Sequence, residues 1–235
     1  MPTLITGLHD SEVRWSKFKN SYMYNDTYYL RRTKFVIYQC ATTAVGVCSG
    51  MAGQGIHKYN HTATYTESLS PTLSVTTTPI IAVLALNIAS AGLIGTIFTP
   101  AIFFDLFWPE RWEASRIQNA WKYAAATSSL LQLAAAVALT VVMGTGHVDI
   151  TAGSDAEWEL ARAVWSDGLY NYDGGLVVAT VVLSWIGAVF TVWSTVVMWM
   201  AYWHNNKYGP FNNHIAKRNE SSGVVTEESE LARTV

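Results

Sequence analysis

Four residues in two polar segments carry side chains of the kind that bind transition metals. His57 and His61 are four positions apart, and His147 stands two positions before Asp149. Three imidazoles and one carboxylate suit Zn²⁺ or Cu²⁺ when the fold brings them together. Nothing in the sequence requires that convergence, and a glycan on Asn60 would obstruct it. A metal site therefore remains an alternative, and we expect no resident cofactor.

Other catalytic chemistry finds little support in the residue pattern. The chain has no serine elbow, no evident Cys–His or Ser–His–Asp set and no glycine-rich phosphate loop. Its two cysteines, Cys40 and Cys48, lie in one apolar segment, where burial keeps thiols protonated and unreactive. A net charge of −2 gives no electrostatic basis for binding nucleic acid. We therefore expect a protein that is not an enzyme.

The distribution of charge predicts the elements that must position these residues. Only 14% of residues are charged, against about 25% in an ordinary soluble domain. Four long segments contain no Asp, Glu, Lys or Arg, and each exceeds the roughly 20 residues that cross a bilayer as a helix. We predict membrane spans at about 35–53, 79–104, 123–144 and 175–203. The predicted fold is an all-α, antiparallel bundle of four transmembrane helices, between an N-terminal segment (1–34) and a disordered tail (204–235).

The positions of the 15 lysines and arginines predict the orientation of the bundle. Nearly all of them lie in the N-terminal segment, the second connection and the tail, whereas the first and third connections hold only Lys58 and Arg162. Cytoplasmic loops carry the excess of positive charge, so both termini should be cytoplasmic. The sequon Asn60-His61-Thr62 then lies outside and predicts a glycoprotein of a eukaryotic plasma membrane or endomembrane.

The third connection shows the pattern of a short helix. Ser154 and Glu157 have the spacing of a capping box, and Trp158, Ala161 and Trp165 recur at helical intervals. We interpret this segment as an interfacial helix lying across the top of the bundle. Acidic residues outnumber the single arginine here, so an acidic platform for a cationic partner is the alternative.

Small and polar residues within the spans predict close packing between helices. Hydroxyl and amide groups form hydrogen bonds across membrane helices, and glycine and alanine let the backbones approach. A functional polar pocket around Gln39 and Asn87 is the alternative. The predicted packing residues are Gly46, Gly50, Gly53, Ala85, Ala89, Gly92 and Gly95, and the intramembrane polar residues are Gln39, Asn87 and Gln132.

Two short stretches resemble a known group of proteins. Leu30–Gln39, which enters the first span, and Asp105–Trp112, which leaves the second, are similar to four-span membrane proteins of filamentous fungi. The layout also resembles that of MARVEL-type proteins. These resemblances imply a membrane location and a four-helix architecture, and they carry no catalytic or binding residues.

Together these features predict a tetraspan membrane protein that organises membrane domains or scaffolds partners through lateral helix contacts. Its expected partners are the lipid bilayer and other membrane proteins or copies of itself. The spans as predicted contain no charged residue, which argues against a pump or voltage sensor. A subunit of an oligomeric channel or small-solute pore remains an alternative, as does an exterior metal or ligand receptor.

Overall fold

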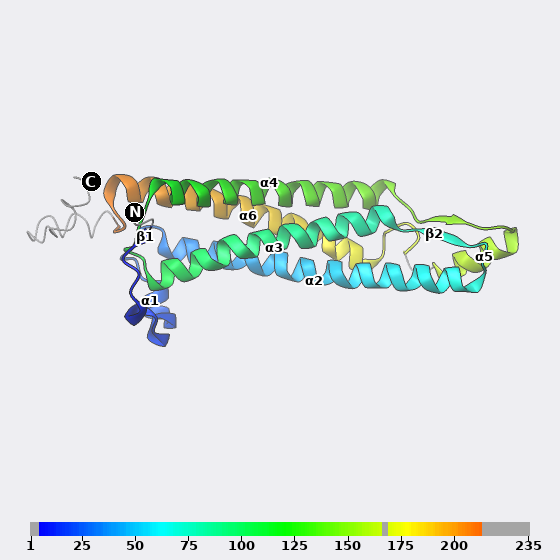
Figure 1. The fold of residues 1–235 in the computed structure, drawn as a ribbon, viewed down its shortest axis with the longest axis horizontal. Coiled ribbons are helices and arrows are strands. Elements are labelled where there is room, and N and C mark those ends of the chain that lie inside the picture. Colours follow the sequence, from blue (N-terminus) through cyan, green and yellow to red (C-terminus); the bar gives the residue numbers. More distant parts are fainter. Residues whose placement is uncertain (1–4, 166–168, 213–235) are drawn as a thin grey trace, which may run out of the picture.

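Four long helices run side by side in the computed structural model, which describes residues 5–165 and 169–212. Consecutive long helices point in opposite directions along one axis (Figure 1). Helix α2 packs against α3 and α6, and α4 packs against the same two helices. The bounds of the four helices are α2 (Arg31–Leu69), α3 (Thr78–Phe107), α4 (Ser115–Thr145) and α6 (Gly175–Tyr208).

All four helices are long and apolar enough to cross a membrane. Each predicted span lies within one of them, so the prediction of four long apolar helices in this order is confirmed. These properties are those of a multi-pass membrane protein. The chain ends its first and last helices later than predicted, because α2 continues to Leu69 and α6 to Tyr208. The predicted disordered tail lies, from residue 213 onward, outside the described residues.

Helix α2 is longer than a bilayer requires. Its 39 residues measure about 58 Å at 1.5 Å per residue, whereas the hydrocarbon core is about 30 Å thick. Its charge-free part ends before Lys58, so the last turns of α2 continue beyond the part of the helix that is apolar enough to cross a bilayer. The segment predicted as an exterior loop therefore begins as a helix, and Asn60 is an exposed residue on it.

Two small antiparallel sheets join segments that are far apart in sequence. At one end of the bundle, β1 (Ile5–Thr6) pairs with β3 (Trp112–Glu113). At the other end, β2 (Ser74–Thr76) pairs with β4 (Asp149–Thr151), with Val75 opposite Ile150. An all-α fold is therefore correct for the bundle and incomplete for its ends. The remaining elements are η1 (Asp10–Glu12), η2 (Trp15–Phe18), α1 (Asn20–Met23) and α5 (Asp155–Val164).

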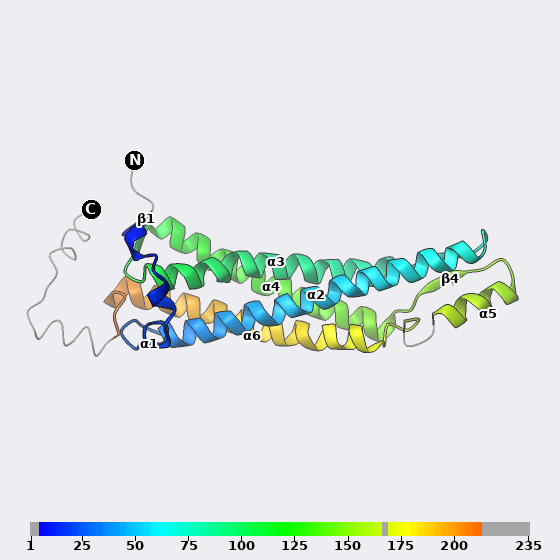
Figure 2. The same ribbon diagram turned by 90° about the horizontal axis from the view of Figure 1, so that it is seen from below.

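Different segments of the chain form the two ends of the bundle (Figure 2). We call the end that holds the residues before α2 and after α6 the terminal end. These two segments contact each other there, because the amide of Tyr29 donates to the carbonyl of Pro210 and Tyr28 forms a β-bridge with Phe211. The end named here the distal end holds β2, β4, α5 and the last turns of α2.

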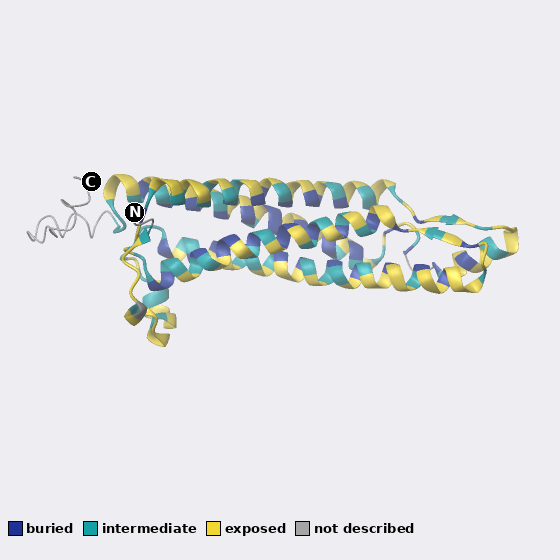
Figure 3. Cartoon of the chain, viewed as in Figure 1, coloured by how far each residue is buried: buried dark blue, intermediate teal, exposed yellow. Residues whose placement is uncertain are grey.

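On α2 and α3 the buried face differs from the small-residue face predicted from sequence. Figure 3 shows buried and exposed residues alternating along the long helices. On α2 the buried residues include Val45, Cys48 and Gly55, whereas Gly46 and Gly50 are exposed. On α3, Ala85, Ala89 and Gly92 are likewise exposed, and Gly53 and Gly95 are half-buried. A methyl group added at any of the five predicted glycines would meet no described atom within 4 Å, apart from its own helix backbone. The packing predicted for these residues does not occur inside this bundle.

The bundle has a different close approach, at a glycine that the sequence analysis did not select. Gly187 of α6 is buried against α2, and a Cβ atom there would lie 2.7 Å from Cγ1 of Val45. Val45 is itself 2% exposed and, being β-branched, has little freedom to move. The absence of a side chain at Gly187 therefore sets the separation of α2 and α6.

Candidate functional site

A network of buried polar side chains joins the membrane helices near the middle of the bundle. Asn87 of α3 accepts a hydrogen bond at Oδ1 from Ser184 Oγ of α6, at 2.8 Å. Gln132 of α4 accepts one from Ser90 Oγ at 2.7 Å and donates from Nε2 to the carbonyl and hydroxyl oxygens of Ser184, each at 3.2 Å. Cys48 of α2 contacts Asn87 Oδ1 at 3.7 Å. We call this set the polar belt.

The polar belt changes the interpretation of the intramembrane polar residues. Asn87 and Gln132 are each 1% exposed, and their amide groups are engaged by neighbouring helices. Gln39 is exposed on the outer surface of α2 and does not join them. The alternative of a functional polar pocket around Gln39 and Asn87 is therefore not supported, because one side chain lies on the outer surface of the bundle and the other lies inside it. Ser184 was missed, because a serine on an otherwise apolar helix gives no sign of its direction.

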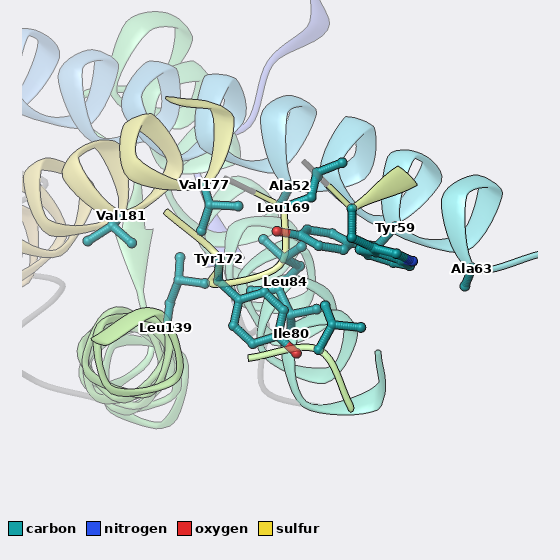
Figure 4. Close-up of a cluster of buried hydrophobic side chains, with 12 residues drawn as sticks. Ala52, Tyr59, Ala63, Ile80, Leu84, Leu139, Leu169, Tyr172, Val177 and Val181 are labelled. Carbon is teal, nitrogen blue, oxygen red and sulfur yellow. The ribbon is translucent and has the colours of Figure 1, made fainter. Parts of the chain in front are cut away.

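The distal end has its own aromatic core. Tyr59, Trp165 and Tyr172 pack together, with ring centroids 6.3 Å apart for Tyr59–Trp165 and 5.7 Å for Tyr59–Tyr172. Figure 4 shows Tyr59 and Tyr172 among the other buried apolar side chains of this core. The indole Nε1 of Trp165 donates to Thr66 Oγ1 at 2.9 Å. This core attaches the third connection to the extension of α2, so the segments of the distal end form one folded unit.

Helix α5 belongs to this distal unit. Ser154 caps it by accepting from the amide of Glu157, as the capping box predicts. The carboxylate of Glu157 also accepts from the hydroxyls of Ser70, at 2.5 Å, and Thr72, at 2.8 Å, which links the first and third connections. These hydrogen bonds lower the pKa of Glu157 below its usual value. Helix α5 thus packs beside the extension of α2 and does not lie across the top of the bundle.

The candidate metal ligands remain in two separate pairs. His57 and His61 are on α2, with ring centroids 6.2 Å apart, and His147 Nε2 lies 3.3 Å from Asp149 Oδ1. Within the described residues, no group of three or more His, Cys, Asp or Glu side chains could hold one metal ion. The four-ligand site considered from sequence is therefore not assembled in this part of the chain.

The terminal end contains a cluster of ion pairs that sequence reasoning missed. Asp105 Oδ2 lies 2.6 Å from Lys34 Nζ, and its Oδ1 lies 3.1 Å from Arg111 Nη1. Arg111 also pairs with Glu113, whose Oε2 accepts from Tyr202 at 2.9 Å. Burial alone would lower the pKa of Arg111, but the two carboxylates outweigh that effect and raise it. These pairs connect α2, α3, α6 and the second connection.

A pocket of about 260 Å³ lies beside this ion-pair cluster, between the ends of α2, α3 and α6. Ala101, Met198 and Tyr38 contribute to its lining from the long helices, and six charged residues line it together with aromatic and uncharged polar residues. One of these, Arg31, is 2% exposed. The sequence does show that charged residues gather at the ends of the predicted spans. Their spacing alone does not show which of them line the same pocket.

Comparison of the chain with protein-family models, with curated proteins and with solved structures finds no match. Its function therefore has to be inferred from its own residues and geometry.

Proposed function

We propose that this chain is a tetraspan protein that associates laterally in a eukaryotic membrane, with both termini cytoplasmic, and organises its neighbourhood through helix contacts. The observation that carries the proposal is the outward position of the small residues on α2 and α3. Gly46 and Gly50 are four positions apart and exposed, as are Ala85 and Ala89. Small residues at this spacing let two membrane helices approach closely.

The interior of the bundle supports the same proposal. The polar groups of Asn87, Gln132 and Ser184 are bonded to one another and to helix carbonyls. Polar side chains that satisfy each other in this way hold helices together and are not available to replace the hydration shell of a passing solute. This arrangement favours a scaffold over a pore through one bundle.

Self-association in liposomes tests the proposal, with a second copy of the chain as the partner. The full chain, labelled with a fluorophore, is reconstituted at decreasing protein-to-lipid ratios, and the oligomer fraction is counted by single-molecule photobleaching. We expect concentration-dependent dimers or higher oligomers. Replacing Gly46 and Gly50 together by Ile should weaken association at least about tenfold, which corresponds to about 1.4 kcal/mol.

Ala134→Ile is the matched control, because Ala134 is a small exposed residue on α4. It should leave association close to that of the natural chain. A natural chain that stays monomeric at every ratio, or a glycine variant that associates as tightly as the natural chain, would contradict the proposal. Glycan attachment at Asn60 in microsomes tests the proposed orientation. If Asn60 stays unmodified while a sequon engineered into the tail is modified, the orientation is the reverse of the one proposed.

A further inference from the structure

Arg31 presents a buried charge without an ion-pair partner among the described residues. It is 2% exposed, and its Nε, Nη1 and Nη2 atoms are buried without a hydrogen-bond acceptor in the described part of the chain. The guanidinium lies over the rings of Tyr22, Tyr28 and Phe35, with its Cζ 4.6, 5.0 and 5.7 Å from the ring centroids. Ring faces attract a cation but do not accept its five N–H groups in the way that oxygen atoms do.

The other charged groups of the pocket are already engaged. Lys34 and Arg111 share the carboxylate of Asp105, and Arg111 also pairs with Glu113. Burying a charge costs several kcal/mol unless it is paired and hydrogen-bonded. Arg31 also occupies the first turn of α2, where the helix dipole adds positive potential and no side chain of the described chain caps the helix. The place beside Arg31 therefore favours an anion.

A carboxylate lines the same pocket, and both it and Arg31 contact Tyr28. Glu110 is exposed, accepts a hydrogen bond from the Tyr28 hydroxyl at 2.6 Å, and forms no ion pair within the described residues. The pocket as a whole is lined by three cationic and three acidic side chains, so a highly charged anion gains little there. A ligand with one negative and one positive group matches both Arg31 and Glu110.

The pocket also lies at a boundary between apolar and polar surroundings. Ala101 and Met198 line it from the apolar parts of α3 and α6, whereas Asp105, Glu110 and Glu113 lie at the end of α3 and in the connection that follows it. In a bilayer this transition marks the level of the lipid headgroups. Its volume of about 260 Å³ lies just below the range for drug-sized ligands, which suits a headgroup.

We propose that this pocket binds a zwitterionic phosphodiester, with the phosphate on the Arg31 guanidinium, whose buried nitrogens are uncovered as the ligand enters, and the ammonium against the Glu110 carboxylate. The ligand chemistry is that of an ethanolamine phospholipid headgroup or of a soluble glycerophosphodiester. Arginine binds phosphate oxygens through paired N–H donors, and the aromatic ring of Tyr28 adds a favourable surface for the ammonium. The site is separate from the small-residue faces, so it does not depend on the proposed lateral association.

Thermal unfolding of the full chain in detergent micelles, followed by tryptophan fluorescence, tests the site. The probes are phosphatidylethanolamine, phosphatidylglycerol, diacylglycerol and soluble glycerophosphoethanolamine, each titrated separately. A bound ligand raises Tm in proportion to its occupancy. We expect phosphatidylethanolamine to raise Tm at lower concentration than phosphatidylglycerol, and diacylglycerol to have no comparable effect. Equal responses to all three lipids would overturn the proposal.

The soluble probe distinguishes the two sources of the headgroup. If glycerophosphoethanolamine raises Tm at the same concentration as the lipid, the site recognises the headgroup chemistry alone and a soluble ligand is its source. If the lipid acts at concentrations at least about tenfold lower, the bilayer supplies the ligand. Either result supports the phosphodiester site, and no response to either ethanolamine compound would overturn it.

Two arginines in one helical turn provide a matched pair of variants. Arg31→Met should weaken the response to phosphatidylethanolamine at least about tenfold. Arg32→Gln, which removes an equal charge from an exposed position, should change the response less than about twofold. Because Arg31→Met removes an unpaired buried charge, its ligand-free Tm should not fall. If folded Arg31→Met protein responds to phosphatidylethanolamine as the natural chain does, the proposal is overturned.

Glu110→Gln provides a second test that does not disturb the buried core. The exposed position should tolerate the amide, and the variant should lose the preference for phosphatidylethanolamine over phosphatidylglycerol while still responding to both. If Arg31→Met does not yield a monodisperse protein, the Glu110→Gln variant decides the test. An unchanged preference for phosphatidylethanolamine over phosphatidylglycerol in that variant would overturn the two-point binding mode.

Discussion

Ser184 Oγ donates a hydrogen bond to Asn87 Oδ1 at 2.8 Å, which joins two residues that are 97 positions apart at the level where α2, α3, α4 and α6 meet. Hydrogen bonds between membrane helices contribute about 0.6 kcal/mol on average and up to about 2 kcal/mol. Several such bonds that share Asn87, Gln132 and Ser184 fix the rotation of each helix about its axis. The polar belt should therefore contribute measurably to the stability of the bundle.

Replacing Gln132 by Leu should destabilise the bundle by about 1–2 kcal/mol, because Ser90 and Ser184 each lose a buried partner. The measurement is the free energy of unfolding in detergent, obtained from a denaturant titration. Gln39→Leu is the control, since Gln39 is exposed on the outer face and its loss should cost nothing. If the two variants lower the free energy of unfolding equally, the loss in Gln132→Leu does not come from the buried hydrogen bonds of the polar belt.

Replacing Gly187 by Ala should cost about 1–3 kcal/mol through overpacking, because the new methyl group would lie 2.7 Å from Cγ1 of Val45. Combining it with Val45→Ala should recover part of that loss, which a double-mutant cycle measures. Gly46→Ala should be neutral or slightly stabilising, since the added methyl group meets no described atom within 4 Å apart from its own helix backbone and alanine favours the helix.

Replacing Asp105 by Asn should destabilise the terminal end by at least about 2 kcal/mol, because Lys34 and Arg111 would keep their charges in a largely buried cluster. Hydrogen exchange of β1, β3 and the first turn of α2 would report the local opening. Asp149→Asn removes an exposed pairing with His147, where the carboxylate side is 68% exposed, and should change stability by less than about 0.5 kcal/mol. Similar exchange in the two variants would argue against the buried cluster.

The distal unit should lose stability at acidic pH. The pKa of Glu157 in the folded chain lies below its unfolded value, since the folded state binds its carboxylate form through Ser70 and Thr72. The stabilisation is therefore complete above the ordinary glutamate pKa and is lost as pH falls through the lowered value. Hydrogen exchange of α5 and β4 should rise over that range. Glu157→Gln should remove most of this pH dependence, and Glu159→Gln, at a neighbouring exposed position, should retain it.

Local signals predicted several features correctly. The four charge-free segments indicate the four long helices, since no shorter or more polar segment could remain helical across a hydrocarbon layer. The capping-box spacing from Ser154 to Glu157 predicts the start of α5. In these cases the determinant lies within a few residues or one helix, so the sequence alone carries it.

The sequence could not show which side of each membrane helix faces inward. In a soluble protein the polar face points to water, but lipid and the bundle interior are both apolar, so hydropathy does not separate Gly46, which faces outward, from Gly55, which is buried. The partners of Asn87, Asp105 and Arg31 are likewise set by residues from other helices and connections. The sequence by itself determined how many long apolar helices this chain forms and which residues lie within them, and the tertiary structure alone decided their rotation, because that depends on contacts between segments far apart along the chain.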